Sequence, residues 1–353
     1  MKKCHVQFDM YFLFLFIVVI IIRLFAIKGR KKNSVGELNF YIAALFVFIA
    51  FRDVAVGNDT GTYCRWYLKT LNYTLTELLE KYSHLMESGY LVFTKVLAML
   101  LPFSRVLILV QGLIVSLSLR AFILRFCKND TFLPIIIFLA FGLLSFHLTG
   151  IRQSLSMSFC LFSYVSASNH RHLAAAFWFS IALSFHTAAI IFILAYLFTY
   201  VWKKYNNLIV TTSLLCVVVA SSAPFIQLYL SQSRDKWNVY EEIERTDNGV
   251  VFFVVVLLIT IFVEFHKKKH MKENAALIRT NYLNLILWSG RLVSRAFERP
   301  ALYFTPYIMT VLPSAVHSIT SPKLRSLAYF SFVFLVSILY IYRYHNSYYS
   351  FCF

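Results

Sequence analysis

Charged side chains are scarce in this sequence. Only 14% of its 353 residues are charged and 59% are hydrophobic, and the mean hydropathy of +0.67 is far above that of a soluble domain. Acidic residues are the scarcest charged group, at 16 against 34 lysines and arginines. The composition therefore excludes a soluble globular protein and indicates an integral membrane protein.

Cysteine motifs and metal motifs are also lacking. The six cysteines form no CxxC pair and no metal-ligand spacing, which argues against a zinc site and a disulfide framework. No evident DxD motif accompanies them, and no internal repeat is visible. We therefore expect no metal ion and no cofactor.

Long apolar runs are what the sequence has in abundance. They recur from residue 10 to residue 342, and several approach the roughly 20 residues that cross a bilayer as a helix. We expect an all-α, polytopic membrane protein with about twelve transmembrane helices (10–13), in a single membrane-embedded domain over residues 1–353. The expected spans are 10–29, 35–51, 105–126, 131–148, 152–168, 172–185, 187–202, 207–225, 249–265, 275–290, 301–319 and 326–342.

The run 89–102 is an exception. It is short for a span and carries Lys95, so it favours an interfacial or re-entrant helix.

Basic loops set the orientation. KGRKK at 28–32, HKKKHMK at 266–272 and the weaker RFCK, HRH, KK and PKLR all fall on one side of this topology, which the positive-inside rule assigns to the cytoplasm. These loops explain most of the formal net charge of +18, so nucleic-acid binding is not expected. Segments 52–88 and 226–248 then become external loops.

Arginines gather on the outward-facing side of this topology, where orientation does not require them. The guanidinium fork binds phosphate oxygens bidentately, so an external anionic ligand would explain the bias. The alternative is that interfacial arginines reach out to lipid headgroups. The arginines concerned are Arg52, Arg65, Arg152, Arg234, Arg245, Arg291, Arg295 and Arg299.

Three inward-running helices are expected to begin on that side with a basic residue. In LTGIRQSLSMSF, Thr149 or Gly150 can cap a helix whose first turn contains Arg152 and Gln153. A cation there opposes the helix dipole, but makes sense if an anion is bound between them.

The other two helix starts are at His186 and Arg299. In LSFHTAAIIF, His186 begins the span 187–202, although a lone histidine at a helix end is often structural. In FERPALYF, Pro300 suits the first helical position, which puts Arg299 at the mouth of the span 301–319. If the three helix starts converge, they form a basic pocket.

The stretch FRDVAVGNDTGTY, residues 51–63, lies at the same face. Gly57 permits a tight turn, Asp59 supplies a carboxylate and Arg52 supplies another cation. The alternative is that Asp59 only neutralises Arg52 in a capped loop.

These motifs, with ESGY at 87–90 and RPALYF, resemble the EpsG/Wzy family of O-antigen and exopolysaccharide polymerases over most of residues 35–345. Asn58, Ser154 and Ser156 depart from the family pattern. The matching positions are Arg52, Gly57, Asp59 and Tyr63 in the first block, Arg152 and Gln153 in the second, His186 in the third, and Arg299, Tyr303 and Phe304 in the last.

The resemblance implies a metal-independent glycosyltransferase in the bacterial inner membrane. It would join oligosaccharide units carried on undecaprenyl pyrophosphate at the periplasmic face, surrounded by membrane lipids and in some cases with a polysaccharide chain-length regulator as partner. The alternatives are a flippase for lipid-linked oligosaccharide and an O-antigen ligase. A flippase would need charges near mid-membrane and repeat symmetry, whereas the selected arginines gather at one face, no repeat is visible and Arg23 is the clearest charge well inside an apolar run.

That chemistry gives the candidate residues their expected roles. Arg152 and Arg299 would stabilise the leaving pyrophosphate. His186 is the first choice as the base and Asp59 the second, because histidine ordinarily titrates nearest neutral pH and a carboxylate beside arginines is a weak base. The expected substrate-binding residues are Arg52, Gly57, Thr60, Tyr63, Gln153, Arg295 and Tyr303.

Overall fold

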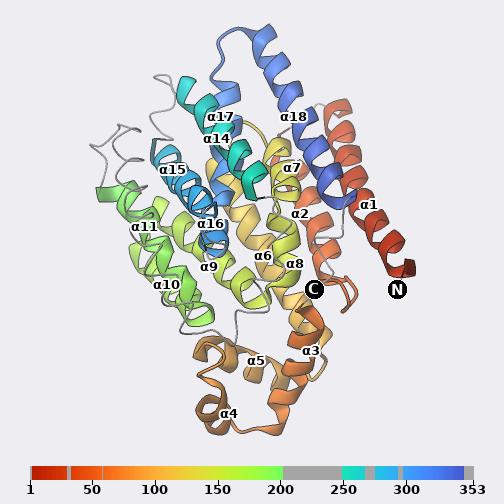
Figure 1. Ribbon diagram of the computed structural model, residues 1–353, viewed down its shortest axis with the longest axis vertical. Coiled ribbons are helices and arrows are strands. Elements are labelled where there is room, and N and C mark those ends of the chain that lie inside the picture. Colours follow the sequence, from red (N-terminus) through yellow and green to blue (C-terminus); the bar gives the residue numbers. More distant parts are fainter. Residues whose placement is uncertain are drawn as a thin grey trace. The chain divides into compact units, whose positions relative to one another are not determined.

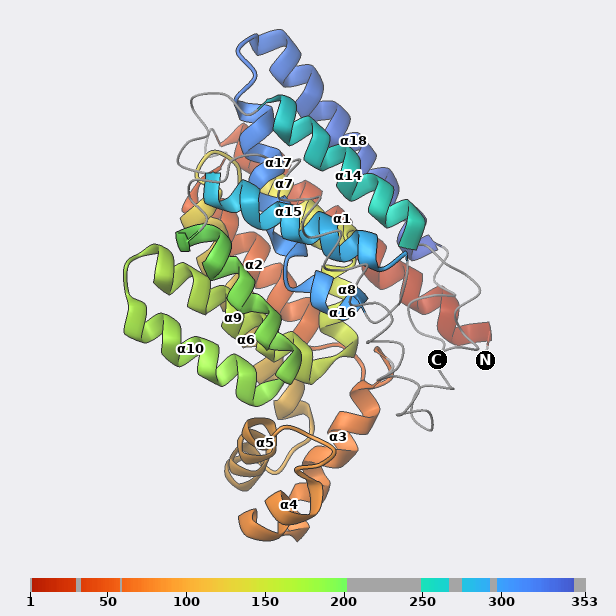
Figure 2. The ribbon, with the colours of Figure 1, turned by 60° about the vertical axis from the view of Figure 1, so that its left-hand side comes forward.

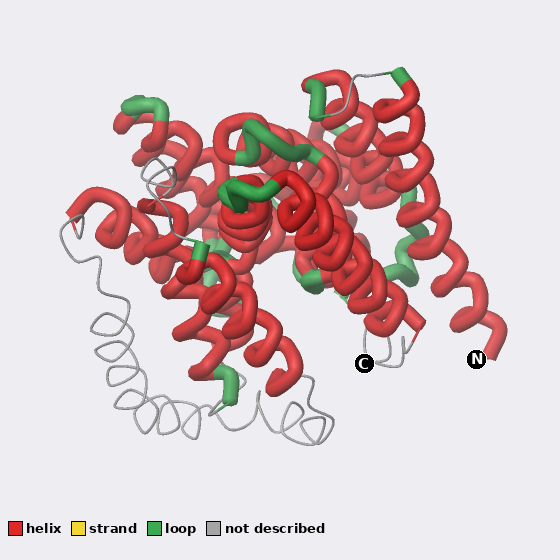
Figure 3. The backbone as a smooth tube through the Cα atoms, turned by 90° about the horizontal axis from the view of Figure 1, so that it is seen from above, coloured by secondary structure: helices red, strands yellow, loops and turns green. Residues whose placement is uncertain are grey.

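A computed structural model describes residues 2–29, 33–57, 59–201, 249–266, 275–292 and 297–345. In these parts the chain forms helices and no strand, as Figure 3 shows, which confirms the all-α class. The predicted span 207–225 and the predicted external loop 226–248 lie outside the described residues. The chain divides into two compact units, Met1–Ile190 with Ser321–Phe353, and Ile191–Thr320.

Three helices of the described parts are long and apolar enough to cross a membrane: α1 (Lys2–Lys28), α6 (Arg105–Phe126) and α18 (Pro322–His345). The pair α7 (Phe132–Ala140) and α8 (Leu143–Thr149) makes a fourth if it is one broken span. Shorter apolar helices follow the other hydrophobic runs. The protein is therefore a multi-pass membrane protein, while the count of twelve spans and the single-domain organisation stay predictions.

Some of the remaining helices of the first unit follow the predicted boundaries closely, while three short helices lie within the predicted loop 52–88. The span predicted at 172–185 is helix α10, and the re-entrant or interfacial run predicted at 89–102 is α5. The bounds are α2 (Val35–Ala50), α3 (Thr60–Lys69), the 3-10 helix η1 (Thr70–Asn72), α4 (Leu75–Tyr82), α5 (Ser88–Leu100), α9 (Ile151–Ser168) and α10 (His172–Phe185).

The predicted external loop 52–88 is mostly helical. Thr74 caps α4, since its hydroxyl accepts a hydrogen bond from the Glu77 amide while the Glu77 carboxylate accepts one from the Thr74 amide. Leu78 and Tyr82 on the inner face of α4 are buried with Leu91 of α5. In Figure 1 helices α3, α4 and α5 lie together at the lower end of this unit, below α9 and α10. The segment is thus a small folded cap rather than an open connection.

The span predicted at 131–148 is broken. Helices α7 and α8 meet at an angle of 56°, and the break falls at Gly142, whose φ is 77°. Broken backbone inside a membrane is tolerated only where protein covers it, and residues 132–144 are all buried. The Leu139 carbonyl near the end of α7 accepts a hydrogen bond from the Tyr344 hydroxyl of α18 at 3.2 Å.

Arg23, the clearest charge inside an apolar run, is neutralised at the junction of α1 and α2. Its Nη1 lies 2.9 Å from Glu37 Oε1, and the Tyr41 hydroxyl donates to the same oxygen at 2.6 Å. The Glu37 side chain is only 1% exposed, so removing Arg23 would leave a buried negative charge without its partner. Arg23 thus ties the first two helices together.

The second unit is built around α15 (Ala275–Gly290), which is buried along most of its length. It contacts α11 (Ile193–Tyr196), the π-helical turn η3 (Leu197–Val201), α14 (Gly249–Phe265), α16 (Glu298–Leu302), the 3-10 helix η6 (Thr305–Tyr307) and α17 (Ile308–His317). Figure 2 shows α14 and α15 running side by side.

Polar contacts join these helices. The Thr305 hydroxyl donates to Asn284 Oδ1 at 3.2 Å, and Asn281 donates to the Thr260 hydroxyl at 3.2 Å. Such hydrogen bonds hold helices together where hydrophobic burial gives no preference between helix and lipid.

Two predicted spans are less regular than expected. The run 187–202 forms the 3-10 helix η2 (Thr187–Phe192) followed by α11 and η3. The run 301–319 is divided into α16, η6 and α17. Helix α16 begins at Glu298, so Pro300 stands at its third position rather than its first. No hydrogen bond within the helix is lost there, because the first four amide groups of a helix have no partner within it.

Candidate active site

Helices α9 and α10 place Arg152 and His186 at the same end of one helix pair. The two helices are consecutive, run antiparallel and lie side by side (Figures 1 and 2). Arg152 is in the first turn of α9, with Gly150 as the N-cap, and His186 directly follows the last turn of α10. Helix α5 contacts α10 and begins at Ser88, so its N-cap residue Glu87 joins them.

Glu87 connects the two basic residues. Its Oε2 lies 2.7 Å from Arg152 Nη1, and its Oε1 lies 2.8 Å from His186 Nδ1. The Thr187 amide also donates to Oε1, at 3.2 Å. The side chains are partly shielded, with exposed fractions of 14% for Glu87, 23% for Arg152 and 15% for His186. Each carboxylate oxygen therefore serves a different cationic or basic group.

Tyr63 completes the cluster from α3. Its hydroxyl accepts a hydrogen bond from Arg152 Nε at 3.2 Å. Arg152 is thus fixed at Nε and Nη1, while its Nη2 makes no hydrogen bond to a residue that the structure describes. An arginine held in this way keeps donors available for an anion.

The charge state of Glu87 follows from its neighbours. Burial raises the pKa of the Glu87 carboxyl, but the hydrogen bond from His186 and the positive charge of Arg152 outweigh it and lower the pKa to about 2. An ionised carboxylate only accepts hydrogen bonds, so His186 Nδ1 carries the proton that faces it.

The other ring nitrogen of His186 is then the basic one. Nε2 is buried and has no hydrogen-bond partner among the described residues. In the neutral imidazole its lone pair is available to take a proton. The cluster therefore combines a guanidinium for an anion with an imidazole nitrogen for a proton.

Gly89 allows α5 to approach α10 closely enough for this contact. A Cβ atom at Gly89 would lie 2.2 Å from the Ser184 hydroxyl and 2.6 Å from the Ser184 carbonyl oxygen. Any other residue would push the two helices apart just beside Glu87. The Glu-Ser-Gly-Tyr motif thus contains both the carboxylate of Glu87 and the glycine that lets α5 pack closely enough to position it.

The model of the EpsG family matches residues 37–353, nearly the whole chain. The chain belongs to the EpsG family. This is a family of Wzy-like polymerases, so the protein is a membrane polysaccharide polymerase of glycosyltransferase type. Comparisons with curated proteins and with solved structures gave no match.

The stretch 51–63 of this EpsG protein closes around one carbonyl group. The Leu148 carbonyl accepts hydrogen bonds from Arg52 Nη2 at 3.2 Å and from the Thr60 hydroxyl at 2.9 Å. Gly57, with the tight turn that the sequence predicts, has φ of 94°, and a Cβ there would lie 2.1 Å from the same oxygen. Leu148 precedes the N-cap Gly150, so the stretch holds the chain that leads into Arg152.

Arg52 is buried, although its position in the motif predicts that it binds substrate. Besides Leu148, it donates to the Ile49 carbonyl at 2.7 Å and to Gln111 Oε1 at 2.9 Å. Burial lowers its pKa to about 10, so it remains a cation at neutral pH. Gln111 in turn donates to the Ser154 hydroxyl on α9 at 3.0 Å. Arg52 therefore supports α9 indirectly, through Gln111 and the Leu148 carbonyl.

Asp59 lies apart from this network. It is the exposed N-cap residue of α3 and its carboxylate makes no capping hydrogen bond. The oxygens that Arg52 contacts belong to Ile49, Gln111 and Leu148, so the alternative in which Asp59 neutralises Arg52 by an ion pair is not seen. Gln153, predicted to bind substrate, is buried on α9.

The remaining predicted residues belong to the second unit. Arg299 is exposed on the short helix α16, and Tyr303 directly after it is buried, with 1% of its surface exposed. Arg295 lies outside the described residues. Whether the Arg299 helix start converges with those of Arg152 and His186 therefore stays a prediction.

No group of three or more potential metal ligands comes together within the described ranges. The expectation that catalysis needs no metal or cofactor stays a prediction.

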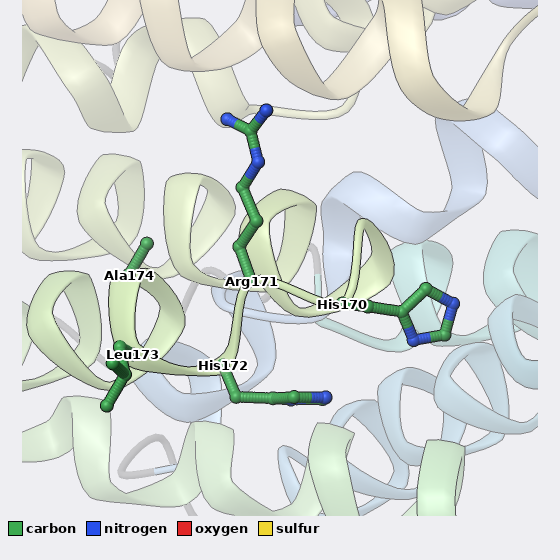
Figure 4. Close-up of a pocket in the computed structure, with 5 residues that line it drawn as sticks. All are labelled: His170, Arg171, His172, Leu173 and Ala174. Atoms are coloured by element: carbon green, nitrogen blue, oxygen red, sulfur yellow. The ribbon is translucent and has the colours of Figure 1, made fainter.

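An open hollow elsewhere in the first unit does not belong to the site. It surrounds the turn between α9 and α10 and is lined by His170, Arg171, His172, Leu173 and Ala174 (Figure 4). Figure 4 shows Arg171 pointing away from the two histidines, whose ring centroids lie 6.3 Å apart. The turn follows Ser168, at the opposite end of α9 from Arg152.

Sequence reasoning missed Glu87 as a site residue. Its contacts with Arg152 and His186 join positions 65 and 99 residues apart, which spacing along the chain does not reveal. The available signal was the motif at 87–90, a lone acidic residue followed at two residues by a glycine. The structure brings together Tyr63, Arg152 and His186 of the predicted residues and adds Glu87.

Proposed function

We propose that this EpsG protein polymerises oligosaccharide repeat units carried on undecaprenyl pyrophosphate, at the periplasmic face of the bacterial inner membrane. The family supplies the polymerase activity, and the lipid carrier and orientation are part of the proposal. The observation that carries it is the cluster in which Glu87 holds Arg152 on one oxygen and His186 Nδ1 on the other, which leaves His186 Nε2 as the basic nitrogen.

Arg152 would hold the diphosphate of the donor. In the reaction the bond between the anomeric carbon and the phosphate oxygen breaks, and negative charge builds up on the leaving oxygen. Nη2 of Arg152 and the amide groups in the first turn of α9 supply positive charge at one place. Stabilising that charge as it develops lowers the barrier more than binding the substrate equally in both states does.

His186 would activate the acceptor. A hydroxyl of the second lipid-linked unit attacks the anomeric carbon, the new glycosidic bond forms, and Nε2 takes the hydroxyl proton. The proton then leaves to solvent or to the released diphosphate. Asp59 is exposed and has no described contact with His186, so the base role goes to His186.

The second unit would contribute Arg299, Tyr303 and Arg295 to substrate binding. This part of the proposal rests on the family pattern rather than on their contacts. The residues Arg52, Gly57 and Thr60, predicted to bind substrate, would instead act by holding the segment before α9.

The test is chain-length analysis of surface polysaccharide in a deletion strain complemented with wild type, Arg152→Ala or His186→Ala. Removing one well-placed donor costs on the order of 10²–10³ in rate, or about 2.7–4 kcal/mol in barrier. We therefore expect both variants to accumulate single-repeat glycolipid with little polymer. Arg171→Ala and His84→Ala are matched controls, because both residues are exposed and lie outside the cluster.

Other outcomes would identify the alternatives. Full-length polymer that is not attached to its final acceptor, in the deletion strain, would indicate a ligase. Single-repeat glycolipid that remains in the cytoplasmic leaflet would indicate a flippase. Wild-type polymer length in both Arg152→Ala and His186→Ala would overturn the proposed site.

A further inference from the structure

We infer that Glu87 is the positioning residue of this site and that it selects the tautomer in which His186 can accept a proton. The inference rests on the proposed function, because it assigns to Glu87 a role that acts through the base of that reaction. Glu87 is not expected to touch substrate.

The contacts of Glu87 divide between its two oxygens. Oε2 accepts from Arg152 Nη1 at 2.7 Å, while Oε1 accepts from His186 Nδ1 at 2.8 Å and from the Thr187 amide at 3.2 Å. Because the Thr187 amide follows His186 in the chain, the same oxygen fixes both the ring and the backbone that carries it. The orientation of the imidazole is therefore determined at two points.

The tautomer follows from the acceptor character of the carboxylate. An ionised carboxylate offers no proton, so Nδ1 must be the donor and Nε2 is left with its lone pair. A buried acid that fixes a histidine in this way is the arrangement found in hydrolase triads, where the acid orients the base and does not itself take the proton. Nε2 is buried and has no hydrogen-bond partner among the described residues, so its lone pair is not occupied by any of them.

Other titratable groups face the same cluster. Arg152 comes from α9, Tyr63 from α3 and Tyr90 from α5, with the rings of Tyr63 and Tyr90 5.9 Å apart. Arg152 is the cation among them, and it competes with His186 for the acceptor atoms of residue 87. This competition makes a Glu87→Gln substitution informative.

In Glu87→Gln the side chain has one carbonyl oxygen and one amide group. The guanidinium of Arg152 is always protonated and can only donate, so it takes the carbonyl oxygen, and the longer contact from the Thr187 amide is lost. The amide group then faces His186 and donates to Nδ1, which moves the histidine proton to Nε2. The substitution keeps the size and the contact with Arg152 but removes the proton acceptor.

The experiment measures polymerisation by purified protein, with the single-repeat glycolipid extracted from the deletion strain as substrate. We expect Glu87→Gln to lower kcat by about 10²–10⁴-fold, the usual contribution of a general base, with a smaller change in KM. Glu80→Gln is the matched control, since Glu80 is an exposed glutamate of α4 outside the cluster. Thermal unfolding of each variant checks that it is folded.

Two further measurements separate this role from a merely structural one. In a His186→Ala background, Glu87→Gln should cause no further loss, because its effect passes through His186. In protein with ¹⁵N-labelled histidine, the His186 signals, identified by their absence in His186→Ala, should report a proton on Nδ1 in the wild type. In Glu87→Gln they should report it on Nε2.

The inference is overturned if folded Glu87→Gln polymerises within about threefold of wild type, or if its loss multiplies in full with that of His186→Ala. Loss of activity with an unchanged His186 tautomer would also overturn it. Failure of the proposed function looks different, since His186→Ala and Arg152→Ala would then be fully active. If those two variants are inactive while Glu87→Gln is active, only the inference fails.

Discussion

The turn at Gly57 gives the sharpest test of how the site is supported. A Gly57→Ala substitution places a Cβ atom 2.1 Å from the Leu148 carbonyl oxygen and 2.6 Å from the Thr60 hydroxyl oxygen. The first contact is with backbone, so it cannot be relieved by rotating a side chain. The backbone φ of 94° is also a conformation that alanine rarely adopts.

Three costs contribute to the expected loss of stability. The left-handed conformation costs an L-residue about 1–2 kcal/mol, overpacking typically costs about 1–3 kcal/mol, and the Thr60–Leu148 hydrogen bond is worth about 0.5–1.5 kcal/mol. These costs overlap, because one shift of the chain relieves the clash and breaks the hydrogen bond together. We expect the free energy of unfolding to fall by about 2–4 kcal/mol, which corresponds to a Tm lower by roughly 3–5 °C for a chain of 353 residues.

The assay is thermal unfolding of the purified protein in detergent, together with polymer length in the complemented deletion strain. Gly36→Ala is the control, because a Cβ there meets only the Ser34 hydroxyl at an ordinary 3.6 Å. That variant should match or slightly exceed wild-type stability, since alanine in a helix is favoured by about 0.5–1 kcal/mol. Equal Tm values for Gly57→Ala and Gly36→Ala would refute the reasoning.

Two more outcomes can be measured in the same preparations. Gly89→Ala should lose activity by at least tenfold, because a Cβ 2.6 Å from the Ser184 carbonyl oxygen moves α5 and Glu87 away from His186; Ser184→Ala in addition should not restore it, since the backbone oxygen remains. The Glu87 carboxyl should also leave a signature in stability, because its pKa is lowered from 4.5 to about 2 in the folded protein. The stabilisation from this carboxylate is complete above about pH 4.5 and is lost as the pH falls toward 2. The Tm advantage of wild type over Glu87→Gln should therefore shrink between pH 4.5 and 2, and this group should cause no change in it above pH 4.5.

Helix positions were largely predictable because lipid imposes a simple rule on the chain. The predicted runs 105–126, 172–185, 249–265 and 275–290 coincide with α6, α10, α14 and α15. A helix that crosses or lines a membrane must bury about the same apolar length each time, and hydropathy reports that length directly.

Irregular backbone was not predictable in the same way. The break between α7 and α8 and the divided run at α16 to α17 occur inside stretches that are mainly apolar. Hydropathy averages over such stretches, whereas the break depends on the φ of Gly142 and on the helices that cover it.

The site itself was predictable only in part. The family pattern pointed to Arg152, His186 and Tyr63, of which Glu87 joins the first two and Arg152 contacts the third. The pattern could not distinguish residues that face a substrate from residues that face the protein. Arg52 and Thr60 share the stretch with Tyr63, yet they are buried against the Leu148 carbonyl, because burial depends on segments nearly 100 residues away.

The hydrogen bond from Tyr344 to the Leu139 carbonyl has a consequence for biogenesis. During synthesis the broken helix reaches the bilayer about 200 residues before its hydroxyl partner is made, as the separation of 205 positions requires. Until α18 inserts, that carbonyl must find water or a temporary donor, since hydrocarbon offers none. A helix made about 200 residues later therefore completes the broken helix, and this pair of segments cannot finish inserting independently of each other.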